Sequence, residues 1–204
     1  MSKSDRPGAA RTRRQLIGAG LALPFVGWRG AAAQSLRPTP ACGDAAGSAR
    51  ETPRQTAGPY YTPNAPQRAA LADPGEPGMR LTLSGRVLTT ACRPIPKALL
   101  DVWQCDAAGN YDNAGFRHRG HLFADASGGY RLETIVPGLY PGRTRHIHIR
   151  VQAPGGRPLT TQLYFPREPA NANDGLWQRD LEIALTPRAG DAAQAGRFDF
   201  VLEA

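Results

Sequence analysis

The sequence predicts an all-β protein, a single antiparallel β-sandwich preceded by an extended segment rich in proline and glycine. The 204 residues include 23 glycines and 19 prolines, which are scattered without a triplet period and interrupt almost every window where a long helix could run. Short stretches of alternating apolar and polar residues lie between turn signals, a pattern typical of sandwiches. The length corresponds to one domain.

An export signal is predicted at residues 1–33. Arg13 and Arg14 precede a moderately apolar run at 16–26, and three alanines at 31–33 form a small-residue cleavage site. Paired arginines before a weakly apolar run indicate a twin-arginine signal, which implies a periplasmic or secreted protein. An ordinary secretory signal and an uncleaved basic tail are the alternatives. The run is shorter than the ~20 residues of a membrane-spanning helix, so no membrane span is expected.

The net charge of +8 is concentrated in that first segment, which holds six basic residues and one acidic residue. The remainder carries 19 basic and 16 acidic residues, a net charge of +3. No stripe of basic residues is interleaved with aromatic ones, so nucleic acid is not an expected partner.

The mature chain is expected to have two parts. Residues 34–79 show no periodicity and form an extended segment over the core, whereas 80–204 form the sandwich. In the strand expected at 146–151, Ile147, Ile149 and Val151 face the core. The expected strands are 80–88, 98–105, 130–134, 146–151, 160–165, 181–185 and 198–202, with one short helix near 174–178.

Three cysteines follow the signal, and an oxidising compartment allows one disulfide among them. Cys42 lies in the proline-rich segment, Cys92 in a turn and Cys105 at the end of an apolar strand. Because disulfides commonly tie a loose terminal segment to a core, Cys42–Cys92 is the preferred pair and Cys105 is expected to be buried and free. The absence of a C-x-x-C pair argues against a thiolate zinc site.

The sharpest local feature is His146-Ile147-His148. Alternate residues of a strand share one face, so the two imidazoles can converge on one metal ion. Two ordinary half-buried histidines are the simpler interpretation of such a short motif. His118 and His121 are expected to be loop residues near the mouth of the site and not ligands.

Two tyrosines would narrow the choice of metal. Histidines alone suit zinc, copper or iron, whereas a tyrosinate is a hard, strongly donating oxygen that favours ferric iron. Tyr140 lies just before the histidine pair, and Tyr111 follows a turn at the end of a strand. Each tyrosine taken alone is more often a packing residue.

Six segments in this order resemble the intradiol ring-cleavage dioxygenases, the family of catechol and protocatechuate 3,4-dioxygenases. The resemblance covers roughly residues 51–204, and its twin-arginine lead is similar to an exported subgroup. Its segments are Gly58-Pro-Tyr-Tyr61, Leu83-Ser-Gly-Arg-Val87, Asp101-Val-Trp-Gln-Cys-Asp-Ala-Ala-Gly-Asn-Tyr111, Thr134-Ile-Val-Pro-Gly-Leu-Tyr140, Arg143-Thr-Arg-His-Ile-His148 and Thr161-Gln-Leu-Tyr-Phe165.

The resemblance implies non-haem Fe(III) as the cofactor, a small aromatic diol and O2 as substrates, and a muconate-type dicarboxylic acid as the product. It implies Tyr111, Tyr140, His146 and His148 as iron ligands, with Tyr140 also leaving the metal to take a substrate proton. It further implies Arg143 and Gln162 as catalytic groups beside the iron. Gly142 stands where the protocatechuate enzymes carry a tryptophan, so the resemblance does not indicate which diol is the substrate. It also leaves open whether the protein forms a homodimer.

Two rival classes remain at this point. One is a secreted β-sandwich binding module, for carbohydrate or with a structural metal, and the other is a periplasmic zinc or copper protein that uses His146 and His148. The sequence carries no G-x-S-x-G, H-E-x-x-H or phosphate-binding G-x-x-x-x-G-K-[ST] motif.

Overall fold

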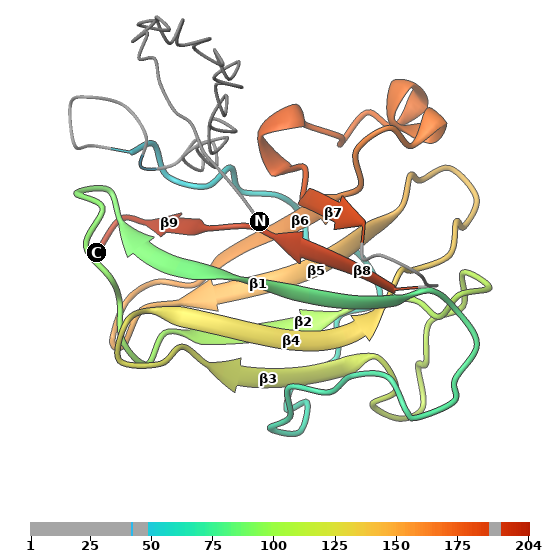
Figure 1. The fold of residues 1–204 in the computed structure, drawn as a ribbon, viewed down its shortest axis with the longest axis horizontal. Helices are drawn as coiled ribbons and strands as arrows, with labels where there is room; N and C mark the ends of the chain where they lie inside the picture. Colours follow the sequence, from blue (N-terminus) through green and yellow to red (C-terminus); the bar gives the residue numbers. More distant parts are fainter. Residues whose placement is uncertain (1–41, 43–48, 188–192) are drawn as a thin grey trace, which may run out of the picture. The chain divides into compact units, whose positions relative to one another are not determined.

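Two β-sheets form the sandwich in the computed structural model, which describes residues 42, 49–187 and 193–204 (Figure 1). One sheet has the order β4-β1-β8-β7, with β9 also pairing with β1, and the other has the order β3-β2-β5-β6. The all-β sandwich predicted from sequence is confirmed. The strands are β1 Arg80–Thr89, β2 Leu99–Trp103, β3 Arg119–Phe123, β4 Gly129–Ile135, β5 His146–Gln152, β6 Leu159–Tyr164, β7 Ala184–Pro187, β8 Ala193–Arg197 and β9 Phe200–Leu202.

The core lies between the two sheets, and the alternating residues fill it as predicted. Leu81, Leu83 and Val87 of β1 are no more than 1% exposed, and Ile147 and Ile149 of β5 are fully buried. Burial of each such side chain contributes about 1.5–3 kcal/mol. The alternation therefore decides which face of β5 is left for polar residues, and that face carries His146 and His148.

The sheets are not purely antiparallel, which corrects the expected strand arrangement. Both β8 and β9 run parallel to β1, β8 beside Arg80–Ser84 and β9 beside Val87–Thr89. Between these two stretches the Asp199 carboxylate accepts the backbone N–H of Arg86, at 2.9 Å. One long strand thus pairs with two short ones in succession, and alternation within each strand carries no information about such pairing.

Two strands and the helix differ from the sequence prediction. Strand β3 was expected to be a loop, and β8 was missed because Ala-Gln-Ala-Gly-Arg has low β-propensity. In β8, Gly196 is tightly packed, since an added Cβ would lie 2.7 Å from Ile183. Residues 174–178 are not helical, and the short 3₁₀ helices η1 (Pro169–Asn173) and η2 (Arg179–Leu181) flank them. The Asp174 carboxylate instead accepts the N–H of Leu176, which closes a turn.

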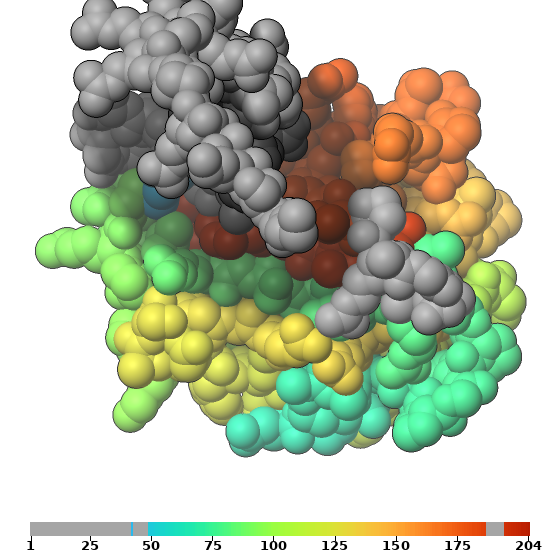
Figure 2. Space-filling model, in the orientation of Figure 1, coloured from blue at the N-terminus to red at the C-terminus, as the bar shows by residue number. Residues whose placement is uncertain are grey.

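The extended segment from residue 49 to 79 binds to both sheets, as expected for a segment lying over the core. Its backbone bonds to β6 through Gln55 and Thr160, to β3 through Arg68 and His121, and to β4 through Leu71 and Glu133. In Figure 2, the teal residues of this segment lie against the yellow strand β4 at one edge of the sandwich. The segment therefore connects the edges of the two sheets.

A disulfide joins Cys42 to Cys92 with a Cα–Cα distance of 5.7 Å, and Cys105 is free and buried. Both cysteine predictions are thereby confirmed. The predicted signal at 1–33 and its boundary with the extended segment lie outside the described residues. Within the part of the chain that is described, no helix is long and apolar enough to cross a membrane.

Candidate metal centre

The candidate centre lies on the face of the β3-β2-β5-β6 sheet that turns away from the core. Strand pairing places Gln162, His148, Trp103 and Arg119 in one row across this face, from β6 to β3. His146 lies beside Tyr164 in the same β5–β6 pair. Although this face is polar, His146 and His148 are only 2% and 1% exposed.

The two histidines point their ring nitrogens at each other. Nε2 of His146 lies 3.1 Å from Nε2 of His148. Nδ1 of His146 lies 2.6 Å from the Thr144 carbonyl, which can only accept, so Nδ1 carries the proton and Nε2 a lone pair. Burial lowers the pKa of His146 to about 4 and that of His148 well below its usual value. Both rings are therefore neutral near pH 7, the state in which imidazole binds metals.

The rings of the two predicted tyrosine ligands approach the histidines. Tyr140 lies 5.6 Å from His146 and Tyr111 lies 6.3 Å from His148, measured between ring centroids. The two tyrosine rings are 5.8 Å apart. The structure thus brings all four predicted ligands together from β5 and two separate loops.

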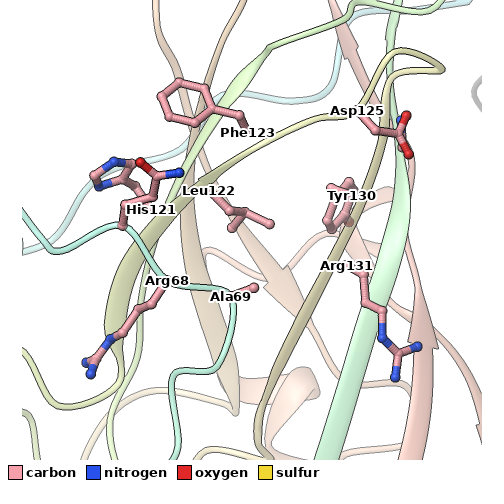
Figure 3. Close-up of a pocket in the computed structure, with 10 residues that line it drawn as sticks. Arg68, Ala69, His121, Leu122, Phe123, Asp125, Tyr130 and Arg131 are labelled. Atoms are coloured by element: carbon pink, nitrogen blue, oxygen red, sulfur yellow. The ribbon is translucent and has the colours of Figure 1, made fainter.

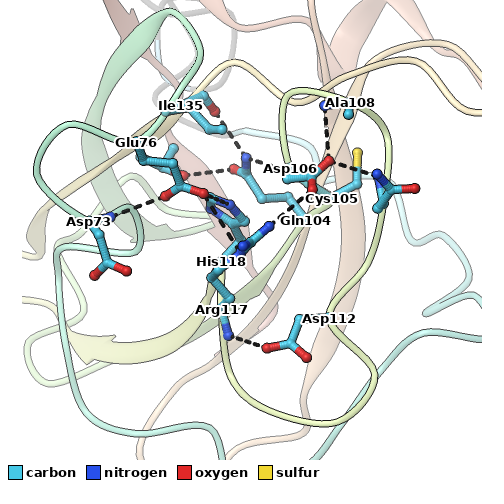
Figure 4. A network of polar contacts seen from close by, with 12 residues as sticks. Asp73, Glu76, Gln104, Cys105, Asp106, Ala108, Asp112, Arg117, His118 and Ile135 are labelled. Atoms are coloured by element: carbon cyan, nitrogen blue, oxygen red, sulfur yellow. Dashed lines mark hydrogen bonds and ion pairs between the residues drawn. The ribbon is translucent and has the colours of Figure 1, made fainter.

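Tyr111 belongs to a loop that polar contacts hold at several points (Figure 4). Asp106 accepts the N–H groups of Ala108 and Asn110, and its carboxylate pairs with Arg117 at 3.0 Å. The Tyr111 hydroxyl itself is buried and has no hydrogen-bond partner among the described residues. An unpaired buried hydroxyl is costly, so this group is suited to a ligand that supplies the missing interaction.

Arg143 and Gln162 form a second polar group beside the histidines. Nη2 of Arg143 donates to Oε1 of Gln162 at 2.6 Å, and Nε of Arg143 donates to Asp174 at 2.9 Å. The Gln162 amide donates to the Thr56 carbonyl, and the Tyr164 hydroxyl also reaches Gln162, at 3.2 Å. The two residues predicted to be catalytic therefore contact each other and are both held by further bonds.

The extended segment lies against His148 and Tyr111. Gly58 has φ +67°, and an added Cβ would lie 3.4 Å from the ring of His148, so a larger residue would be both strained and crowded. The Tyr60 ring stacks on Tyr111 with centroids 4.4 Å apart and planes 16° from parallel. This contact helps to explain why His148, on the strand face that turns away from the core, is buried.

The donor set fits a ferric ion. Two neutral imidazoles offer lone pairs, and two tyrosinates would balance two of the three positive charges of Fe(III). Burial raises the pKa of Tyr111 and also that of Tyr140, whose neighbour Arg143 opposes the increase. A strong Lewis acid is therefore needed to deprotonate them at neutral pH. In the described part of the chain, no group of three or more His, Cys, Asp and Glu residues is arranged so that it could hold a metal ion.

Several residues of the site were not predicted from the sequence. Tyr60 lies within the Gly-Pro-Tyr-Tyr segment, which was recognised without a role, and Asp174 lies within the expected helix. Trp103 stacks on His148 with ring centroids 4.9 Å apart. This contact could have been predicted only if the pairing of Trp103 in β2 with His148 in β5 had been known. The other two histidines were both expected in a loop, which is confirmed for His118, in the turn before β3, and wrong for His121. His121 lies in β3, and His118 is 1% exposed and contacts Glu76 at 2.8 Å.

A separate hollow of about 520 Å³ lies between β3 and β4 (Figure 3). Its lining includes Phe123, Tyr130 and Arg131 but none of the four candidate ligands. The side chains of Arg68 and Arg131 point to opposite sides of it, so their charges do not converge. This hollow does not contribute to the candidate metal centre.

Comparisons with known proteins agree with this geometry. Residues 56–204 match the protein family described as Dioxygenase. The chain is 37% identical over 129 residues to the protocatechuate 3,4-dioxygenase beta chain of Burkholderia cepacia, covering 54% of this chain and 55% of that one. It is 33% identical over 172 residues to catechol 1,2-dioxygenase 2 of Acinetobacter lwoffii, covering 72% of this chain and 62% of that one. It thus spans between half and two thirds of these curated relatives.

A solved structure is similar over almost its whole length. It is the dioxygenase domain of a dioxygenase carbohydrate-binding protein fusion from Streptomyces sp. SirexAA-E, with 51% identity and a TM-score of 0.73. The match covers 76% of this chain and 99% of that domain. The family match, the shared sandwich and the assembled tyrosines and histidines lead to one conclusion: this chain belongs to the intradiol ring-cleavage dioxygenase family.

Proposed function

We propose that this protein is a ferric-iron enzyme that cleaves a catechol-type aromatic diol with O2, between the two hydroxyl-bearing carbons, to a muconate-type dicarboxylic acid. The observation that carries the proposal is the meeting of Tyr111, Tyr140, His146 and His148 in one place, where the Tyr111 hydroxyl is buried and bonds to none of the described residues. Family membership supports the reaction class, and relatives named for catechol and protocatechuate support the substrate class.

The four side chains would hold the iron through the two Nε2 atoms and the two phenolate oxygens. When bound, ferric iron supplies Lewis acidity to the diol and a path for its electrons to O2. The family resemblance assigns exchange to Tyr140, which lies in a turn closed by a Tyr140–Arg143 bridge and so beside the Arg143 cation. Its phenolate oxygen would accept a proton from the arriving diol, and the nearby Arg143 would steady the developing charge.

Arg143 and Gln162 would act on the organic substrate and not on the metal. The guanidinium is fixed by Asp174, so it offers preorganised positive charge beside the histidines. Gln162 receives one Arg143 N–H and donates to Thr56, which orients its amide. Thr56, which accepts this bond, also lines a hollow of about 380 Å³ together with Gln55 and Leu176, but none of the four candidate ligands lines it.

The test is a spectrum, a metal analysis and a product assay on one preparation. The iron-loaded protein is expected to be reddish, since tyrosinates transfer charge to ferric iron, and to consume O2 with catechol, protocatechuate or hydroxyquinol while forming a ring-opened dicarboxylate. Colourless protein that binds no iron would instead support the binding-module alternative. A preparation that prefers zinc or copper would identify the site as one of the other metal proteins considered above.

We also propose that the protein is exported by the twin-arginine route. The paired Arg13 and Arg14 support this, and so does the disulfide between Cys42 and Cys92, which forms in oxidising compartments. Fractionation of cells that express the full chain is expected to find the protein outside the cytoplasm. An Arg13→Lys, Arg14→Lys double variant should remain inside, and equal export of both would reject this route.

A further inference from the structure

Arg119 on β3 is a completely buried arginine. It is 1% exposed and ranks among the largest buried side chains of the described chain. None of the ion pairs formed between described residues includes it. Burial of a cation without a carboxylate partner is costly, and such charges are rare unless other bonds compensate. Its position therefore requires a reason beyond packing.

The guanidinium of Arg119 donates hydrogen bonds to two backbone carbonyls. Nε and Nη2 both donate to the carbonyl oxygen of Asp112, at 3.0 and 2.9 Å, and Nη1 donates to that of Tyr60, at 2.6 Å. Asp112 directly follows Tyr111 in its loop, and Tyr60 belongs to the extended segment. One side chain thus joins the loop that carries a proposed ligand to the segment that covers it.

The two residues that carry these carbonyls are both neighbours of Tyr111. Tyr60 stacks on the ring, as described above, and the central carbon of the Arg119 guanidinium lies 5.9 Å from the ring centroid. The Tyr111 hydroxyl has no bond of its own, so the ring is located only by its neighbours and its backbone. The Arg119 fork fixes that backbone at the residue after Tyr111.

Arg119 also lies at one end of the row of paired residues that contains His148. Arg119 pairs with Trp103 across β3 and β2, and Trp103 pairs with His148 and stacks on it with planes 5° apart. Strand spacing is set by the backbone ladder, so the distance from Arg119 to His148 is fixed. A residue anchored in this row can therefore locate the Tyr111 loop relative to the histidine pair.

We propose that Arg119 is a positioning residue that sets the Tyr111 loop and Tyr60 against the histidine strand and so places the Tyr111 phenol oxygen beside the two Nε2 atoms. The proposal rests on the function proposed above only in naming that oxygen as a ligand. The planar guanidinium of Arg119 is essential to this role, because its donors are held in a fixed fork that bonds to both carbonyls at once. Lysine retains the positive charge but has a single ammonium group in place of the fork. The relevant property is geometry and not charge alone.

The experiment compares Arg119→Met and Arg119→Lys with wild type, and uses Arg131→Met, an exposed arginine on β4, as the matched control. Hydrogen exchange of the metal-free full-length protein measures protection of amides 108–117 and 55–61 against those of β1 and β4. Iron-loaded protein is then compared for the position of its tyrosinate absorption band and for its resistance to a chelator. Thermal melting shows whether each variant is folded.

Both Arg119 variants are expected to exchange the two named segments at least tenfold faster, with β1 and β4 unchanged. They should also shift the absorption band and release iron faster. The Arg131→Met control should match wild type in every readout. If Arg119→Met does not fold, Arg119→Lys alone decides the question.

Wild-type protection in a folded Arg119→Lys protein, together with an unshifted band, would overturn the proposal. Loss of protection everywhere, including β1 and β4, would also overturn it, because the residue would then only support the fold. If wild type binds no iron, the function proposed above fails, yet the exchange comparison still tests whether Arg119 sets the loop.

Discussion

Asp174 offers a sharp test of how the site is held together, because one carboxylate supports three groups. Its Oδ2 accepts Nε of Arg143 at 2.9 Å and the N–H of Thr144 at 2.8 Å, and its Oδ1 accepts the N–H of Leu176 at 2.9 Å. The side chain is only 2% exposed, and that of Arg143 is 16% exposed. Asp174→Ala would leave a largely buried guanidinium and two backbone donors without their acceptor.

The expected loss of unfolding free energy is roughly 2–4 kcal/mol. Removing one partner of a fully buried ion pair costs about 3–5 kcal/mol, and partial access of water to Arg143 lowers that figure. Asp174→Asn keeps the shape and some acceptor capacity, so its loss should be smaller. The control is Asp180→Asn, since Asp180 is exposed and lies close by in the chain. Its stability should stay within about 0.5 kcal/mol of wild type.

The stability that Asp174 contributes is expected to depend on pH. Burial favours the neutral acid, but the N–H groups of Thr144 and Leu176 and the Arg143 guanidinium outweigh it and hold the pKa of Asp174 below its usual 3.8. A depressed carboxyl pKa contributes stability above about pH 4, which is lost as the pH falls through the folded-state value. The gap between wild type and Asp174→Asn should therefore narrow below pH 4.

The assay is urea unfolding at a series of pH values from 7 down to 2.5. Activity measured alongside should fall in Asp174→Ala even at temperatures where it is folded, because Arg143 loses its anchor. An Asp174→Asn protein as stable as wild type at pH 7, or a gap that stays constant down to pH 2.5, would refute this reasoning.

Further predictions concern the proposed catalytic group, the metal, the disulfide and the core. Arg143→Ala should keep iron and colour but lose ~10²–10³ in kcat, and full activity would remove it from the mechanism. His148→Ala should lose iron, so unchanged metal content would contradict the ligand assignment. Cys42→Ser, which opens a loop with a sequence separation of 50, should cost about 4 kcal/mol in the loop-entropy model, measured against Cys105→Ser by chemical unfolding. Leu100→Ala, fully buried between the sheets, should cost about 2–5 kcal/mol, and a smaller loss would show that the core there is loosely packed.

Much of the sandwich could be predicted because burial leaves a direct trace in the sequence. Ile147, Ile149 and Val151 alternate with polar residues, and one-sided burial of a strand requires that alternation. Strand β8 left no such trace, since Gly196 is selected by close packing and not by hydrophobicity. The helix expected near 174–178 was wrong: these residues form a turn between η1 and η2, closed by the backbone bond from the N–H of Trp177 to the carbonyl of Asp174.

The sequence by itself determined the residue types of the site and the face on which His146 and His148 lie, because alternation along a strand is a local property. Only the tertiary structure decided that Tyr111 and Tyr140 meet them, that Tyr60 stacks on Tyr111 and that Arg119 joins the segment of Tyr60 to the loop of Tyr111. Those contacts depend on which strands pair and on where the extended segment crosses the sheets. Strand pairing is set by the summed packing of residues distant in the chain, so no single stretch of sequence records it.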